Sequence, residues 1–333
     1  MARSFETCPY CGGGEGLFDD DHIFPQFLGG KKTIRACKNC NSRFGSTFEG
    51  IVSRSLAPFS VTLSRGGIKP ARPVLFRRAY QDEHGKWWDI NSDGDGWLSV
   101  PEVRRGSDGH ITAAHFRTQK EADALMRRAI ALGKHKYASG SDSKKIGLDK
   151  IRFQFRLELG DEIKKLVVKM CIAVVEETGL IKNAQFEVPR MFLQGSSVQN
   201  IPVYFDFRNL SIDDLRPPLA HLIYLDTNPR AKRTFGLVQF YGTVQFYCLL
   251  GREAATDHQA VAFSLSPGDF RENFMEVRPP PCITPAPKFI TPEQRDEGLK
   301  KWANKFADQV QVVTGKPITS TIDLAPANQS DSV

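Results

Sequence analysis

The sequence predicts an α+β protein in which a small cysteine-bearing module precedes a larger mixed domain with a mainly antiparallel sheet. Three observations support this fold class. Four of the seven cysteines lie in the first forty residues, helical periodicity marks two later segments, and hairpin patterns dominate the second half. A length of 333 residues, at roughly 150 residues per domain, predicts about two domains. We expect a module at 1–60, a linker and hairpin region at 61–150, an α+β domain at 151–320 and a disordered tail at 321–333.

The composition is that of a soluble folded protein. Apolar residues make up 41% and charged residues 25% of the chain, close to the averages for globular proteins. The longest apolar stretch, Leu166–Val175, is interrupted by Lys169 and is too short to span a membrane. Met1–Tyr10 lacks the apolar run of a secretory signal. We therefore expect a cytoplasmic protein without a membrane partner.

The net charge of +7 is concentrated near the N-terminus. Residues 1–80 contain twelve Lys or Arg against six Asp or Glu. A basic face attracts polyanions because contacts to phosphates release condensed counterions, so nucleic acid is the favoured class of partner. A solvated, solubilising surface is the alternative reading of the charge taken alone.

Two Cys-x-x-Cys pairs stand near the N-terminus, Cys8 with Cys11 and Cys37 with Cys40, and 25 residues separate them. In a reducing compartment such pairs favour metal binding over disulfides, and each two-residue gap lets both thiolates reach one ion at ~2.3 Å. Four thiolates complete a tetrahedral Zn²⁺ site and leave no position open for substrate. The site is therefore expected to be structural, and any chemistry must come from other residues.

Polar residues suited to catalysis lie between the two pairs and directly after the second one. Asp21-His22-Ile23-Phe24-Pro25 stands between them, Gly29-Gly30 indicates a turn, and Asn41 follows Cys40. In this order the features resemble the HNH, or ββα-metal, endonuclease family, in particular its zinc-stapled members. The resemblance covers roughly residues 8–50. It implies a hairpin packed on a short helix, with the two cysteine pairs tying the hairpin to the start of the helix.

Local patterns place the elements of that module. His22–Phe24, before Pro25, and Thr33–Ala36 have the apolar content of strands, and the helix is expected to begin between residues 39 and 42. Successive strand residues point to opposite faces, so Asp21 and His22 cannot play equivalent parts.

The resemblance implies a role for each of these polar residues. Asp21 and Asn41 would be ligands of a catalytic divalent cation, Mg²⁺ or Mn²⁺, because hard oxygen donors suit such ions. His22 would be the general base that takes a proton from the attacking water. Hydrolysis of a phosphodiester in double-stranded DNA would then leave 5′-phosphate and 3′-hydroxyl ends.

The sequence departs from the common family pattern in one respect. No histidine occurs between His22 and His84, so the last metal ligand of many members is missing, and either Glu49 or water completes the set. Asp19 and Asp20 are expected to be exposed turn residues rather than ligands. Three basic residues of the module are candidate contacts to DNA phosphates: Arg35, Lys38 and Arg43.

The middle of the chain has weaker signals. Ser53–Arg78, with its prolines and Gly66-Gly67, predicts a linker without a helix, and residues 74–80 and 86–90 predict a hairpin. Asn91–Glu102 matches the oxygen spacing of an EF-hand, but Pro101 and the preceding strand pattern favour a turn-rich loop over a calcium site. A capping box predicts a helix from Thr118 to about Leu132, followed by a polar loop at 134–150.

The remaining segments predict the larger domain. Apolar residues at helical spacing predict a helix over 161–178, and Phe235–Tyr241 with Thr243–Leu250 predict a hairpin. Segments 219–225 and 261–265 would add strands to the same sheet, with the helix packed on it. A last helix is expected from Pro292 to about Val310.

The sequence therefore predicts a Mg²⁺-dependent HNH DNA endonuclease that nicks as a monomer, with a C-terminal domain that senses, recruits or restrains. The layout resembles nuclease effectors of bacterial anti-phage systems, including the nicking component of some Zorya systems, so further defence subunits or a homodimer are possible partners. Restriction and junction-resolving endonucleases remain alternatives within the enzyme class. From another class, a zinc-containing DNA-binding or regulatory protein would bind without cutting.

Overall fold

The computed structural model divides the chain into two compact units. The first comprises Met1–Leu56, Gly66–Arg72 and Leu157–Thr319, and the second comprises Ala57–Arg65, Pro73–Arg156 and Ser320–Val333. The residues that the structure describes are 7–14, 16–73, 75–82, 84–91, 96–100, 102–105, 107, 111–115, 120–121, 123–124, 127–128, 160–181, 186–196, 201–208, 210, 212–252, 256–279, 283 and 291–315.

The N-terminal part of the first unit is a β-hairpin followed by a long helix. Strands β1 and β2 pair antiparallel, with Asp21 opposite Ile34. The helix contains a π-helical stretch, η2, between two α-helical stretches, and single π-turns of this kind are frequent at functional sites. The bounds are β1 Phe18–His22, η1 Gln26–Leu28, β2 Thr33–Cys37, α1 Lys38–Phe44, η2 Gly45–Glu49 and α2 Gly50–Ser55. The predicted ββα module is confirmed.

The first strand ends earlier than the sequence predicts. We expected a strand at His22–Phe24, but β1 ends at His22. The apolar side chains that suggested a strand are buried elsewhere: the Phe24 ring packs on Phe263 of the larger sheet, with the ring centroids 5.0 Å apart. The turn that follows also requires glycine, because a Cβ on Gly30 would collide with the carbonyl oxygen of Phe24.

The larger part of the first unit is built on a six-stranded antiparallel sheet, in the order β13-β12-β9-β10-β11-β8. Its elements are α5 Asp161–Thr178, α6 Glu187–Leu193, β8 Val203–Phe205, η3 Asp213–Leu215, β9 His221–Asn228, β10 Arg233–Phe240, β11 Val244–Gly251, β12 Gln259–Leu265, β13 Glu272–Val277 and α7 Pro292–Thr314. The predicted α+β class, hairpin and added strands are confirmed, and α7 runs four residues further than expected.

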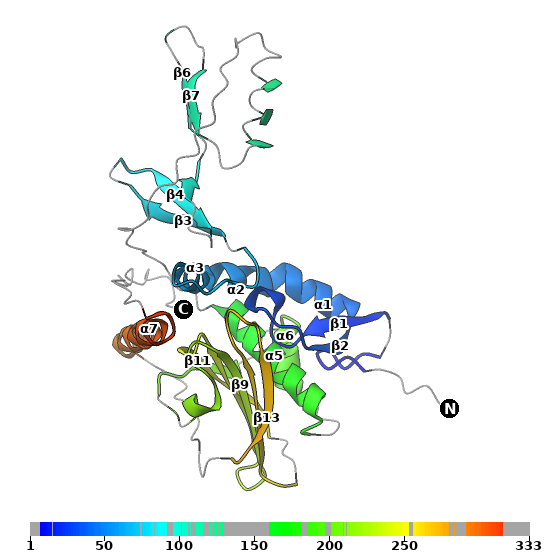
Figure 1. Ribbon diagram of the computed structural model, residues 1–333. Coiled ribbons are helices and arrows are strands. Elements are labelled where there is room, and N and C mark those ends of the chain that lie inside the picture. Colours follow the sequence, from blue (N-terminus) through cyan, green and yellow to red (C-terminus); the bar gives the residue numbers. More distant parts are fainter. Residues whose placement is uncertain are drawn as a thin grey trace. The chain divides into compact units, whose positions relative to one another are not determined.

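Helix α5 connects the sheet to the N-terminal module. Figure 1 shows it between the sheet and the β1–β2 hairpin, and it contacts β9, β10 and β11 as well as η2 and β2. The bounds match the prediction for 161–178. Because one helix packs against both neighbours, the module and the sheet form one compact body in which α5 can supply side chains to the module.

The second unit contains α3 Ala57–Arg65, a three-stranded sheet of β3 Leu75–Gln81, β4 Trp87–Asn91 and β5 Gly96–Leu98, and a hairpin of β6 Glu102–Arg105 and β7 Ile111–His115. The expected β3–β4 hairpin is confirmed. The expectation of no helix in Ser53–Arg78 is wrong, because residues 53–55 belong to α2 and α3 follows. Pro58 stands in the first turn of α3, where a missing N–H costs no hydrogen bond.

Several predicted features lie wholly or partly outside the described residues. These are residues 92–95 and 101 of the EF-hand-like segment Asn91–Glu102, most of the helix expected at Thr118–Leu132, the polar loop at 134–150 and the tail at 321–333. The described rest of Asn91–Glu102 includes β5 and the first residue of β6, so the expectation of a turn-rich loop is wrong for this part. Within the part of the chain that the structure describes, no helix is both long and apolar enough to cross a bilayer.

Candidate functional site

The four cysteines of the two pairs converge on one point. Their sulfur atoms all lie within 4.8 Å of one another, and Cys11 Sγ and Cys37 Sγ are 3.8 Å apart. A tetrahedron with metal–sulfur bonds of ~2.3 Å places its sulfurs about 3.8 Å apart, so the spacing fits zinc. The Cys40 thiol lowers the pKa of Cys8 to about 4 through a hydrogen bond, and the same bond raises the pKa of Cys40.

Helix α6 of the larger part supports the cysteine cluster. Gln194, at the C-terminal end of α6, donates to Cys40 Sγ at 3.7 Å and to the carbonyl of Tyr10 at 3.2 Å. Arg190 Nε donates to the carbonyl of Pro9 at 2.8 Å. Hydrogen bonds to the ligands of a metal site and to their neighbouring main chain fix the orientation of those ligands. Gln194 and Arg190 therefore anchor the cysteine cluster, although they lie far from it in the sequence.

Asp21 faces the interior between the hairpin and the helices. Its carboxylate is 3% exposed, and both oxygens have partners: Tyr10 Oη donates to Oδ2 at 2.6 Å and Lys169 Nζ contacts Oδ1 at 2.8 Å. Burial is the main cause that raises the pKa of Tyr10 well above its ordinary value, with the nearby Asp21 adding to it. The Tyr10 hydroxyl therefore stays protonated and donates to the carboxylate.

Lys169 of α5 connects three parts of the module. Besides Asp21, its ammonium contacts Glu49 Oε1 at 2.5 Å and the main-chain oxygen of His22 at 3.2 Å. The lysine is 0% exposed, and its neighbours on α5 are buried apolar residues. The Lys169 ammonium therefore bridges two carboxylates, that of Asp21 on β1 and that of Glu49 on the π-helical stretch.

His22 lies on the opposite face of β1 and is partly exposed. Gln26 Nε2 is 3.2 Å from His22 Nε2, while the Arg72 guanidinium donates to Gln26 Oε1. Because that guanidinium can only donate, Oε1 must face it, so Gln26 presents its amide N–H groups to the imidazole. His22 Nε2 is then the acceptor, so its single lone pair is bonded to the Gln26 amide on the exposed side of the module.

Asn41 lies in the second turn of the helix, beside the end of β1. Its Nδ2 donates to the carbonyl of Asp20 at 3.1 Å. Only the amide NH₂ can donate to a carbonyl, so this bond fixes the orientation of the side chain and leaves Oδ1 as the end available to a cation. The structure thus brings Asn41 to the peptide that precedes Asp21 and His22.

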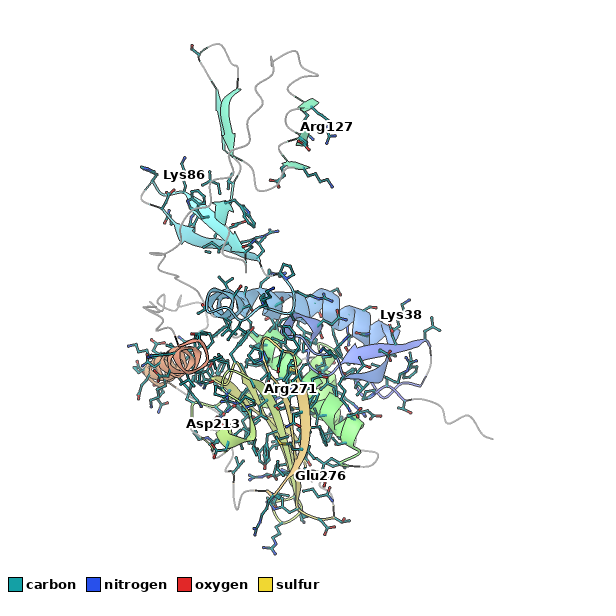
Figure 2. The ribbon with its side chains drawn as sticks, viewed as in Figure 1. Lys38, Lys86, Arg127, Asp213, Arg271 and Glu276 are labelled. Carbon is teal, nitrogen blue, oxygen red and sulfur yellow. The ribbon has the colours of Figure 1, made fainter. Side chains whose placement is uncertain are left out.

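The remaining predicted residues lie on the surface of the module. Asp19 and Asp20 are exposed as expected but lie in β1 rather than in a turn, and Arg35 pairs with Asp20 at 3.2 Å. Lys38 is exposed at the start of α1, and Figure 2 shows it at the periphery of the module. Arg43 Nη2 donates to Gln194 Oε1 at 2.5 Å, so this arginine also connects the module to α6.

Two residues of the site were missed by sequence reasoning. Tyr10 stands inside the first cysteine knuckle, where only its position between Cys8 and Cys11 gave a signal. Lys169 was visible as a charge that interrupts an apolar stretch, which is itself an indication of a buried partner. Nothing local in the sequence names that partner, because Lys169 and His22 are 147 positions apart.

The donor set of the module fits a hard divalent cation. A carboxylate offers about four lone-pair positions, of which Tyr10 and Lys169 use one on each oxygen of Asp21. The amide oxygen of Asn41 is a second hard donor, and its side chain is bonded to the carbonyl of Asp20, the residue before Asp21. Oxygen donors of this kind suit Mg²⁺ or Mn²⁺, whereas the four thiols of the neighbouring cluster suit Zn²⁺.

The N-terminal module matches a known protein family. Residues 8–57 match the family model described as HNH endonuclease. Comparisons with curated proteins and with solved structures give no match. The matched segment contains both cysteine pairs, β1, β2 and the helix that carries Asn41. The part of the chain from Cys8 to Ala57 is therefore an HNH endonuclease module.

Proposed function

We propose that the protein is a DNA endonuclease that hydrolyses phosphodiester bonds with the help of a divalent cation, Mg²⁺ or Mn²⁺. One observation carries the proposal: Asn41 is hydrogen-bonded to the main chain beside Asp21 and His22, within the segment that matches the HNH family. The residues that the family pattern requires are thus near one another at one end of β1. In the same proposal, structural Zn²⁺ is held by Cys8, Cys11, Cys37 and Cys40, whose sulfur atoms lie within 4.8 Å of one another.

In this proposal each residue of the module has a separate task. His22 accepts a proton from water at Nε2 after that water replaces the Gln26 amide at the single lone pair of this nitrogen, and the resulting hydroxide attacks phosphorus. Asp21 and Asn41 hold the divalent cation through oxygen atoms, with Tyr10 and Lys169 fixing the carboxylate. When bound, the cation stabilises the negative charge that develops on the leaving 3′ oxygen. The products carry 5′-phosphate and 3′-hydroxyl ends.

Supercoiled plasmid tests the proposal directly. With Mg²⁺ or Mn²⁺, the wild-type chain is expected to convert supercoiled plasmid to the open circular form, and chelation of the added cation by EDTA is expected to stop the reaction. Gel analysis of the topoisomers gives the rate. Because EDTA can also remove zinc, a sample restored with Mg²⁺ alone is the control. A chain that binds plasmid without relaxing it under any cation would instead be a zinc-containing DNA-binding protein.

DNA approach is proposed to occur over the basic surface of the module, with Arg35, Lys38 and Arg43 contacting phosphates. Lys38→Gln is expected to weaken DNA binding about threefold, because one phosphate contact is lost. The slope of log affinity against log salt concentration should also become shallower by about one. Fluorescence anisotropy at several salt concentrations measures both. Lys300→Gln, an exposed charge change on α7, is the matched control. An equal loss in both variants would argue against a local contact.

The biological setting is also a proposal. One active site cuts one strand, so a monomer nicks, and a double-strand break requires a homodimer or two successive events. The larger sheet domain senses, recruits or restrains, and the protein acts in the cytoplasm as an effector of bacterial anti-phage defence, with other defence subunits as partners. Restriction and junction-resolving activities are the alternatives, and a panel of linear, nicked and branched DNA substrates distinguishes them.

A further inference from the structure

Lys169 lies on α5, outside the segment that matches the HNH family, but its ammonium contacts the end of β1. We propose that Lys169 is a positioning residue of the nuclease site, which holds the Asp21 carboxylate and the main chain of His22 in the geometry that the reaction needs. This inference rests on the proposed nuclease function. It makes α5 part of the active module, although α5 stands far from it in the sequence.

The contacts of the ammonium support positioning rather than a chance surface pair. A lysine has three N–H donors, and three acceptors surround Nζ: Asp21 Oδ1 at 2.8 Å, Glu49 Oε1 at 2.5 Å and the His22 carbonyl at 3.2 Å. The set joins the last two residues of β1 to the π-helical stretch. A movement of α5 would therefore displace both the proposed cation ligand and the backbone of the proposed base.

The setting of Lys169 supports the same conclusion. It is fully buried in the middle of α5, between Val168 and Met170, which are also buried. A buried charge is strongly unfavourable unless it is paired and hydrogen-bonded. Because α5 is packed against both the sheet and the module, the lysine is held from a rigid element, as a positioning group requires.

The charges give the inference a distinctive consequence. Asp21 and Glu49 carry two negative charges, and the ammonium leaves one net negative charge in the cluster. Lys169 should therefore weaken the attraction of the cluster for a dication while it improves the geometry of Asp21. Loss of Lys169 is expected to strengthen cation binding and to slow the reaction, and a purely structural role would not produce these opposite changes.

The test compares Lys169→Met with Lys165→Met in the full chain. Lys165 is one turn earlier on α5 and lies over the Phe192 ring, so its variant is the matched charge control. For Lys169→Met we expect kcat for plasmid nicking to fall about 100-fold, with the KM for DNA changed by less than about threefold. Zinc content should stay at the wild-type value. In the His22→Ala background, Mn²⁺ should bind about tenfold more tightly, as measured by electron paramagnetic resonance.

Lys169→Arg provides a second variant that keeps the buried charge and changes only its geometry. We expect its kcat to fall about tenfold. If Lys169→Met does not fold, a wild-type kcat in folded Lys169→Arg would overturn the proposal. If Lys169→Met folds, a wild-type kcat in this variant overturns the proposal. A rise of both kcat and the Mn²⁺ affinity also overturns it, because Lys169 would then restrain the reaction. If kcat and the Mn²⁺ affinity both fell, the role of Lys169 would be merely structural, and the proposal would be overturned. A wild-type chain that cuts no DNA would refute only the proposed function, and unchanged Mn²⁺ affinity would then refute the positioning role.

Discussion

Replacement of His22 by alanine is expected to lower the rate of plasmid nicking about 1,000-fold, which lies within the range for removal of a general base. The imidazole is the basic group that the module presents on the exposed side of β1, and its Nε2 accepts a hydrogen bond from Gln26. Alanine removes the proton acceptor but leaves β1, Asp21 and Asn41 in place. The measurement is the single-turnover rate with saturating Mg²⁺.

His84→Ala is the matched control for this prediction. His84 is exposed in the turn between β3 and β4, outside the HNH module, so its removal should leave the rate unchanged. His22→Ala should retain zinc content, thermal stability and DNA affinity, because the side chain is partly exposed and makes no contact to the cysteine cluster in the described geometry. Equal nicking by the His22 variant and the wild-type chain would show that another group is the base.

Replacement of Cys40 by alanine is expected to remove zinc and to lower the free energy of unfolding by several kcal/mol, on the order of the metal-binding energy of small zinc domains. Cys40 belongs to α1 and connects the helix start to the knuckle that carries Cys8 and Cys11. Three thiolates cannot close the tetrahedral site. Mass spectrometry of metals and thermal unfolding measure the two effects.

Cys248→Ala is the control that distinguishes the effect of losing zinc from the effect of losing a buried cysteine. Cys248 is buried in β11, where burial raises the pKa of its thiol well above the ordinary value, and it lies outside the four-cysteine cluster. Its variant should keep zinc at the wild-type ratio of about one per chain, with only the stability cost of a small cavity. If Cys40→Ala retained zinc and unfolded at the wild-type temperature, the cluster would not be a structural zinc site.

Local patterns were sufficient to predict the fold class and most of the elements. Helix α5 was predicted with its observed bounds because apolar residues recur at helical spacing and Gly179 ends the pattern. The prediction failed at Ser53–Arg78, where proline and glycine were taken as breakers of a helix. Pro58 stands where a helix tolerates it, and the glycines come only after Arg65, the last residue of α3.

The candidate site could be predicted only as far as its residues are near one another in sequence. The cysteine spacing and the order of Asp21, His22 and Asn41 are local, so they were found. The contacts of Asp21 depend on how α5 packs against the module, and no pattern in residues 8–57 contains that information. The orientation of Asn41 likewise depends on a hydrogen bond across the hairpin and helix.

The turn of the hairpin has a consequence for protein engineering. Glu272, at the start of β13, accepts hydrogen bonds from the main-chain N–H groups of Lys31 and Lys32, and Phe24 is buried against Phe263. A fragment cut after the matched segment would leave the two amide N–H groups bonded only to water and would expose the Phe24 side chain, an apolar surface that β12 covers in the full chain. The HNH module therefore cannot be transferred alone, and a chimaera that grafts it onto another scaffold must also include α5 and the β12–β13 edge.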